Sequence, residues 1–224
     1  FINGSSLSEQ GLSQLHINEK IKHCISITKR LAEVHHQQII HLNLNPGHIL
    51  IEEQTGIVYF ISLGLATRLQ KKIPEKNRLI FSAADLDFIA PEQTGRINKN
   101  IGYYTDIYSL GVVFYWIFTG IAPFEYKEGS SKIHAHMAIS PKRPDEISDC
   151  PLAISRLIMK MLEKDIQNRY HSATGVVFDL DLIANGLLQG GNTEHIELGL
   201  NDSSGQLRFS NQLYGRDSQI ATLK

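Results

Sequence analysis

The stretch HLNLNPGHIL, residues 41–50, joins two parts of the chain whose sequence patterns predict regular structure. Before it, apolar residues recur at close to helical spacing over residues 17–39, which predicts a long amphipathic helix. At its end, the apolar run HILI (48–51) is separated by the turn EEQTG from a second β-rich run, GIVYFI (56–61). Two such runs around a turn that ends in glycine predict a β-hairpin.

Beyond the hairpin the pattern changes to a loop and then to helices. Residues 64–104 contain several glycines and prolines and show no sustained period, and loops of this length in compact domains are usually functional. Residues 105–119 are apolar nearly all round, which predicts a buried helix. This order predicts an α+β fold that is mostly α. Two further helices are predicted, at 151–164 with Pro151 in the first turn and at 172–188 with Ser172 as N-cap.

The composition narrows the class of protein. The chain has 224 residues, of which 42% are hydrophobic, and this is enough for the core of a large domain. A formal net charge of −1 gives no electrostatic reason to expect nucleic acid or an anionic membrane as a partner. Cys24 and Cys150 are too few for a disulfide framework and suit a reducing compartment, and no apolar run is long enough to span a membrane. We expect a cytoplasmic domain.

The ten histidines raise the question of a metal site. Four of them, His35, His36, His41 and His48, lie near one another in sequence, but no cysteine joins them at zinc-site spacing. We therefore expect solvated or core histidines and no bound metal.

Four short motifs in the same order resemble the C-terminal lobe of a eukaryotic-type Ser/Thr protein kinase domain. Residues 41–48 fall on the catalytic-loop signature H-R-D-L-x-x-x-N, and residues 62–64 fall on the metal-binding signature D-F-G. The A-P-E motif is intact at residues 90–92, and DIYSLGVVFYWIFTGIAPF (106–124) resembles the buried helix that follows it. The resemblance covers residues 1–188.

The resemblance implies structural roles for four residues. It implies that Asp106 ties the buried helix to the catalytic loop that begins at His41, and that Arg169, in the segment NRYHSA, pairs with Glu92. Residues 1–15 resemble the hinge between kinase lobes and the short helix after it. No G-x-G-x-x-G and no V-A-I-K precede them, so we expect the kinase N-terminal lobe to be absent from the chain.

The charged positions of the resembled motifs hold neutral residues. Asn43 stands where the catalytic base would be, and an amide cannot take a proton at neutral pH. Asn45 replaces the lysine that meets the transferring phosphate. His48 and Ser62 replace the two Mg²⁺ ligands, although Mg²⁺ prefers charged oxygen donors, while Gly64 of D-F-G is retained. We take these positions as degenerate catalytic (43, 45) and Mg·ATP (48, 62, 64) sites.

The regulatory positions differ as well. Leu42 stands where an arginine would read an activation-loop phosphate, so a phosphate on Ser82 would have no obvious charge partner. Asp85 lies about where a threonine would help to hold the catalytic loop.

The tail suggests a longer parent protein. Residues 189–206 are rich in Gly, Asn and Ser and predict a flexible linker. Together with APEQTGRINKNIGYYTDIYSLG, the segment LYGRDSQIATL resembles large signalling proteins that join a kinase-like head to a P-loop ATPase, a GAF domain and a sensor histidine kinase. We expect residues 207–224 to begin the ATPase domain, and the chain, which opens without methionine, to be a piece of such a protein.

These observations lead to three functional hypotheses. The first is a pseudokinase: a kinase-like domain that regulates or binds other proteins, or other domains of its own polypeptide, in a two-component signalling protein and needs no cofactor. The alternative is an atypical Ser/Thr kinase that uses ATP and Mg²⁺ and has its N-terminal lobe outside this fragment. A third is that any transferase activity belongs to a distant histidine-kinase domain.

Overall fold

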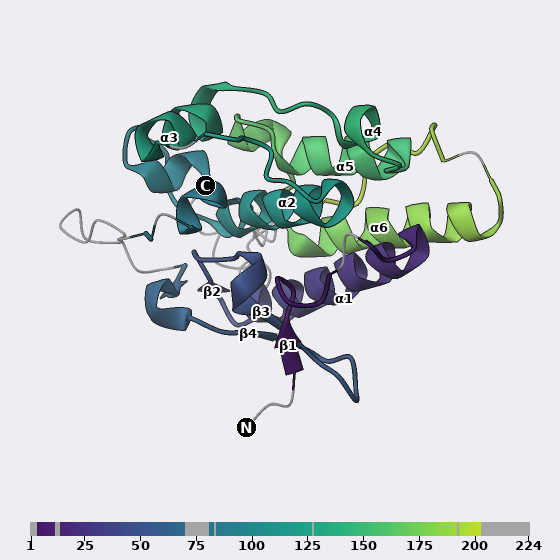
Figure 1. Ribbon diagram of the computed structural model, residues 1–224. Coiled ribbons are helices and arrows are strands. Elements are labelled where there is room, and N and C mark those ends of the chain that lie inside the picture. Colours follow the sequence, from purple (N-terminus) through teal and green to yellow (C-terminus); the bar gives the residue numbers. More distant parts are fainter. Residues whose placement is uncertain are drawn as a thin grey trace, which may run out of the picture.

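The computed structural model describes residues 4–11, 14–69, 81–82, 84–126, 128–191 and 193–202. The fold is mostly helical, with two small sheets at one end (Figure 1). The helices are α1 (Ile17–His36), α2 (Tyr103–Thr119), α3 (Gly129–Ala138), α4 (Pro144–Ile147), α5 (Leu152–Met161) and α6 (Ala173–Leu188). The strands are β1 (Gly4–Ser6), β2 (Ile39–Ile40), β3 (Ile49–Glu52), β4 (Val58–Phe60) and β5 (Thr67–Arg68). Short 3₁₀ turns include η3 (Leu63–Leu65), η4 (Asp85–Asp87) and η5 (Pro91–Thr94).

The hairpin is confirmed as β3 and β4, which pair antiparallel with Leu50 opposite Tyr59. On its other edge β3 pairs antiparallel with β1, so β3 is the central strand of a three-stranded sheet. The second sheet pairs β2 with β5, which brings the residue before the catalytic-loop stretch close to the segment after the hairpin. The two sheets thus hold both ends of the stretch 41–50.

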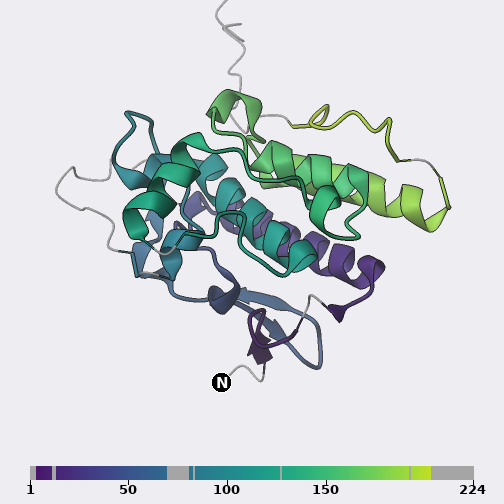
Figure 2. The ribbon, with the colours of Figure 1, turned by 45° about the horizontal axis from the view of Figure 1, so that its top comes forward.

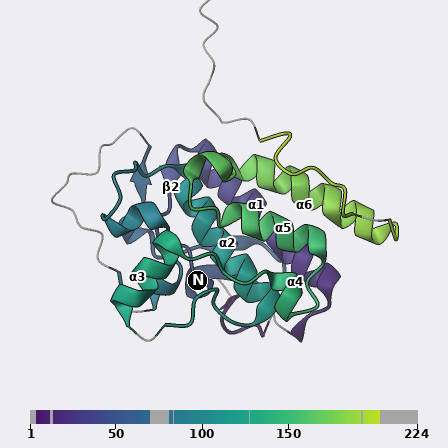
Figure 3. The ribbon, with the colours of Figure 1, turned by 90° about the horizontal axis from the view of Figure 1, so that it is seen from above.

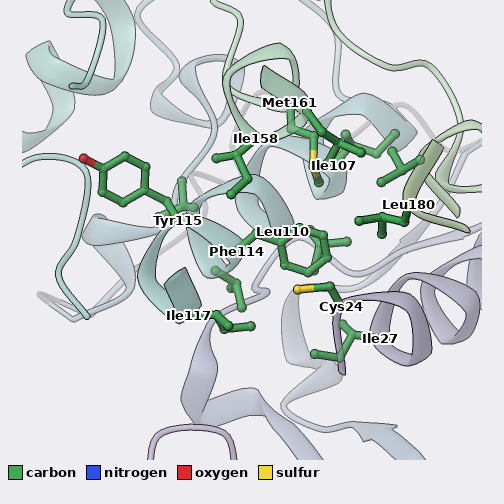
Figure 4. Packing of buried hydrophobic residues seen from close by; sticks show 14 of the residues in the cluster. Cys24, Ile27, Ile107, Leu110, Phe114, Tyr115, Ile117, Ile158, Met161 and Leu180 are labelled. Atoms are coloured by element: carbon green, nitrogen blue, oxygen red, sulfur yellow. The ribbon is translucent and has the colours of Figure 1, made fainter. Parts of the chain in front are cut away.

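Helix α2 forms the centre of the domain, as its apolar sequence predicts. Most of its residues are buried, and Figure 4 shows its side chains between those of α1, α5 and α6, including Cys24, Leu110 and Ile158. Figures 2 and 3 show α5 beside α2 and α6 running along α1. Burying one leucine or isoleucine side chain contributes about 1.5–3 kcal/mol to the free energy of unfolding. The packing of these helices therefore supplies most of the stability of the fold.

Several predicted boundaries shift by a few residues. The first long helix ends at His36 because Gln38 has a φ of +59°, which no α-helix allows. Pro151 precedes α5 as its cap instead of lying in its first turn. Ser172 caps α6 as predicted, since its Oγ accepts a hydrogen bond of 3.0 Å from the backbone N–H of Gly175. The short helix expected near the N-terminus is not formed by residues 7–11, which make turns after β1.

The prediction of a flexible linker over 189–206 is wrong for residues 193–202. This segment packs against the helical core through Ile196 and Leu198, and Thr193 is buried. Residues 203–206 and 207–224, the latter the expected start of an ATPase domain, lie outside the described residues. Among the described helices, none combines the length and the apolar character needed to cross a bilayer.

Candidate functional site

The carboxylate of Asp106 holds the start of the loop that follows β2. It accepts hydrogen bonds of 2.8 Å from the backbone N–H groups of His41 and Leu42, and the Nε2 atom of His35 lies 2.9 Å away. The Asp106 side chain is completely buried, in the first turn of α2, where the helix dipole favours a negative charge. The predicted connection between the buried helix and this loop, through the side chain of Asp106, is therefore present.

The imidazole of His41 joins the same loop to the hairpin. Its Nε2 atom lies 3.1 Å from the carbonyl oxygen of Ile61, and its Nδ1 accepts a hydrogen bond of 3.3 Å from the backbone N–H of Asn43. Burial lowers the pKa of His41, against the opposing effect of the Asp106 charge. A neutral ring that donates from Nε2 and accepts at Nδ1 satisfies both bonds.

Leu42, the residue before Asn43, has an uncommon backbone conformation. Its φ is +65°, in the left-handed region, which costs a residue with a Cβ about 1–2 kcal/mol. Its carbonyl oxygen accepts a hydrogen bond of 2.7 Å from Nε2 of Gln93, and the Oε1 of Gln93 accepts one from Ala90. The bonds to Asp106 and Gln93 therefore hold the loop in place and connect it to the A-P-E segment.

Asn45 is fixed inside the loop by its own side-chain hydrogen bonds. Its Oδ1 accepts from the backbone N–H of His48 (3.1 Å), and its Nδ2 donates to Oδ1 of Asp85 (2.9 Å). Asp85 in turn accepts a hydrogen bond from the backbone N–H of Ser82 (3.0 Å). Asp85, which the sequence placed where a threonine would hold this loop, thus contacts the loop through a carboxylate–amide pair.

His48 lies beside this pair and contacts Asn43 and Asn45. The Nδ1 atom of His48 lies 2.9 Å from the carbonyl oxygen of Asn43, and the backbone N–H of Ile61 donates to the carbonyl of His48. The Asn43 side chain is half-buried and makes no hydrogen bond to any described residue. Ser62 is exposed, with a φ of +62°, and Gly64 follows in η3. His48 contacts both Asn43 and Asn45. Within the described part of the chain, Ser62 is connected to this group through its neighbour Ile61, whose N–H donates to His48.

The predicted ion pair between Glu92 and Arg169 is present and buried. Oε1 of Glu92 lies 2.9 Å from Nη1 of Arg169, and both side chains are completely inaccessible to solvent. Arg169 also donates to the backbone carbonyls of Glu163 and Tyr104. The pair is monodentate, because Oε2 of Glu92 and Nη2 of Arg169 have no partner among the described residues.

Sequence reasoning missed a buried polar chain beside this ion pair. Nζ of Lys164 donates to the Tyr108 hydroxyl, and that hydroxyl donates to Nδ1 of His136, each over 3.0 Å. Burial, assisted by the charge of Arg169, lowers the pKa of Lys164 to about 7. Burial also lowers the pKa of His136 to about 3, with the charge of Lys164 as the next cause. No sequence pattern signals these contacts, which join residues 28 and 56 positions apart.

An open hollow of about 430 Å³ is lined by residues of α1, β2, β4, β5 and the segment between β4 and β5. None of the predicted site residues 43, 45, 48, 62 and 64 lines it. Its walls are Arg30, Val34, Ile39, Phe60, Leu63, Ala66, Thr67 and Arg68. Within the described residues, no three His, Cys, Asp or Glu side chains are grouped as metal ligands would be.

Comparison with known proteins gives consistent matches. The family described as the protein kinase domain matches residues 3–177. The chain is 34% identical over 163 residues to a probable serine/threonine-protein kinase of Clostridium perfringens, covering 71% of this chain. It is 27% identical over 218 residues to a peroxide stress-activated histidine kinase of Schizosaccharomyces pombe (92% of this chain). It is 36% identical over 115 residues to a hybrid signal transduction histidine kinase of Dictyostelium discoideum (51% of this chain).

All three relatives are much longer than this chain. It spans 23% of the length of the bacterial protein, 9% of the fission-yeast protein and 3% of the Dictyostelium protein. The family match covers most of the described residues, including the loop 41–48, the ion pair of Glu92 with Arg169, and Asp106. The chain therefore belongs to the protein kinase domain family.

Proposed function

We propose that this domain is a catalytically degenerate kinase-like domain that serves as a regulatory or interaction module in a multidomain two-component signalling protein. The proposal rests on the hydrogen bonds that the side chain of Asn45 makes within the fold. Asn45 stands where a cation would meet the phosphate, and its amide is taken up by Asp85 and by the backbone N–H of His48. Such a group neither brings charge nor is free to turn toward a substrate.

The donor set does not fit a base or a magnesium site. Asn43 cannot accept a proton at neutral pH, and Ser62 offers a neutral hydroxyl where Mg²⁺ needs a carboxylate. His48 offers an imidazole whose Nδ1 faces the carbonyl of Asn43. The carboxylate of Asp85 is bonded to Asn45 and Ser82. No step of phosphoryl transfer is therefore assigned to these residues.

The relatives support the context of the proposal. Two of the proteins reported above are histidine kinases by name, and each is many times longer than this chain. We infer that the partners are other domains of the same polypeptide or other proteins, with no contact to nucleic acid or membrane. We also infer that the chain supplies the C-terminal lobe of the kinase fold, in the cytoplasm. The alternative, an atypical Ser/Thr kinase that uses ATP and Mg²⁺, is favoured by the name of the bacterial relative.

Thermal unfolding of the full-length protein, which includes any N-terminal lobe, with and without millimolar Mg·ATP separates the two functions. A working site would stabilise the protein by RT ln(1 + [L]/Kd), or about 2.7 kcal/mol when the ligand is at 100 times Kd. We expect no shift beyond that of MgCl₂ alone. A clear shift with Mg·ATP that is lost in Asn45→Ala would overturn the proposal.

A rescue experiment examines the same question from the other side. In the full-length protein, the variant Asn43→Asp, Asn45→Lys, His48→Asn, Ser62→Asp restores the four positions together. We expect at most weak phosphoryl transfer, because a lysine at 45 would lie within reach of the Asp85 carboxylate, which would neutralise its charge. Strong transfer by the unmodified protein, abolished by Asn43→Ala, would instead support the enzyme.

A further inference from the structure

Residues 193–202, here called the strap, run back along α6 in the opposite direction (Figure 1). Two glycines on α6 allow this close approach. A Cβ at Gly186 would lie 2.7 Å from Cγ2 of Thr193, and a Cβ at Gly175 would lie 2.6 Å from Oδ1 of Asp202. Larger residues at these two positions would collide with the strap, so the helix surface is shaped to receive it.

The C-terminal end of the strap is fastened by a nearly buried carboxylate. Asp202 accepts hydrogen bonds from the backbone N–H groups of His171 (2.7 Å) and Ser172 (2.9 Å) and from the Ser172 hydroxyl (2.8 Å). Its side chain is 5% exposed. These donors lie at and just before the N-cap of α6, where backbone N–H groups lack partners within the helix.

The middle of the strap is fastened by a second buried carboxylate. Asp179 of α6 accepts a hydrogen bond of 2.7 Å from the backbone N–H of Gly199 and one of 2.5 Å from the Tyr170 hydroxyl. Near the start of the strap, Arg156 of α5 donates to the carbonyl of Glu194. The strap is therefore bonded to α5, to α6 and to the turn between them.

The turn formed by residues 169–172 connects the strap to the A-P-E segment. Arg169 pairs with Glu92, and the Tyr170 hydroxyl donates to Asp179. The backbone N–H groups of His171 and Ser172 donate to Asp202. On the other side, Gln93 donates to the carbonyl of Leu42 in the degenerate catalytic loop. Consecutive residues of one turn thus hold two segments that are far apart in sequence.

We propose that the strap and the segment 90–93 are energetically coupled through the turn 169–172, so that the strap conveys the state of the kinase-like loop to whatever follows Asp202. If the bonds to Asp202 are lost, the backbone of His171 and Ser172 is released. A shift of that backbone moves Arg169, whose guanidinium has a single bond to Glu92. The regulatory purpose rests on the proposed function, whereas the coupling is a separate physical claim.

Residue-resolved hydrogen exchange on the 224-residue chain tests the coupling. Asp202→Asn keeps the size of the side chain and removes its charge. Glu197→Gln is the matched control, because Glu197 is an exposed strap residue that forms no hydrogen bond or ion pair with a described residue. We expect Asp202→Asn to accelerate exchange on the order of fivefold at the backbone amides of Ala90 and Gln93. The amide of Gly56, in the distant hairpin turn, and all amides of Glu197→Gln should keep their rates.

Acceleration confined to the strap, or equal acceleration at Gly56, would overturn the coupling. A double-mutant cycle of Asp202→Asn with Glu92→Gln gives a second measurement. The effects of two independent substitutions on the free energy of unfolding add, whereas those of two coupled substitutions do not. Because we propose coupling, we expect the unfolding constant of the double variant to differ at least about fivefold from the product of the single effects. Agreement with that product would equally overturn the claim. Mg·ATP binding, which bears on the proposed function, changes neither outcome.

Discussion

The loop 41–48 and the ion pair of Glu92 with Arg169 are connected through Gln93, yet the two regions use polar groups in opposite ways. Asp106, Glu92 and Arg169 are charged and completely buried, and each holds backbone or a partner of opposite charge. In the loop, Asn43 and Asn45 are neutral, and the bonds of Asn45 stay within the fold. The chain therefore carries buried charge where backbone must be held, and neutral amides where phosphoryl transfer would need charge.

The largest effect is expected when the carboxylate that holds the loop is removed. Asp106→Ala leaves the buried N–H groups of His41 and Leu42 and the ring of His35 without their acceptor. Since each orphaned buried donor costs about 1–3 kcal/mol, we expect the free energy of unfolding in urea to fall by about 5 kcal/mol. Asp181→Ala, which removes an exposed carboxylate, should cost less than about 0.5 kcal/mol. Similar losses in both variants would contradict the role of Asp106.

The next effect belongs to the ion pair. Glu92→Ala leaves the charge of Arg169 buried and unpaired, which typically costs about 3–5 kcal/mol. We expect about 3 kcal/mol, the lower end, because only one oxygen of Glu92 is bonded. Urea unfolding of Glu92→Ala beside Glu53→Ala, an exposed turn residue, measures the difference. A loss within about 0.5 kcal/mol would mean that the pair is not formed in solution.

The comparison of these regions also shows what a sequence can predict. The periodicity of apolar residues predicted α1, and an apolar run predicted the buried helix α2. The N-cap Ser172 marked the start of α6. Family resemblance located the contacts of Asp106 and of Arg169 with Glu92. Both kinds of signal depend on motifs whose order and spacing are visible in one chain.

The strap shows where the sequence was not sufficient. Its Gly, Asn and Ser content is typical of a linker. Asp202 nevertheless accepts hydrogen bonds from the backbone N–H groups before α6, and Gly175 and Gly186 leave space for the strap. Composition does not encode which distant donors lack an acceptor. The chain of Lys164, Tyr108 and His136 was missed for the same reason.

A smaller, pH-dependent effect is expected from the buried polar chain. His136 faces the Tyr108 hydroxyl, the cations of Lys164 and Lys132 and the backbone of Leu86 and Asp87. Its pKa is about 3 in the folded state and near 6.5 when unfolded, so between these values the unfolded state binds more protons. Stability should therefore fall as the pH falls from about 6.5, and His136→Asn should reduce this dependence.

At higher pH, Lys164 should also make the free energy of unfolding rise with pH. It faces Tyr108, Arg169 and Glu163, and its folded pKa of about 7 lies below the usual 10.5. The unfolded state binds more protons between these values, so stability should rise with pH over that range, and Lys164→Met should flatten the rise. Urea unfolding from pH 4 to 9 measures both slopes. His134 is an exposed histidine of α3, the helix that carries His136. His134→Asn should leave both slopes unchanged, and an equal change in this variant would refute the assignment of the slopes to His136 and Lys164.

The smallest effect is expected at Asn43. The Asn43 side chain is half-buried and makes no hydrogen bond to a described residue, so Asn43→Ala should change the free energy of unfolding by no more than about 0.5 kcal/mol. Asn45→Ala is the matched comparison. It removes the bonds to His48 and Asp85 and should cost about 1–2 kcal/mol. Urea unfolding of both variants decides whether the loop is held by Asn45 and is indifferent to position 43. A larger loss for Asn43→Ala than for Asn45→Ala would give the base position a structural role that the geometry does not show.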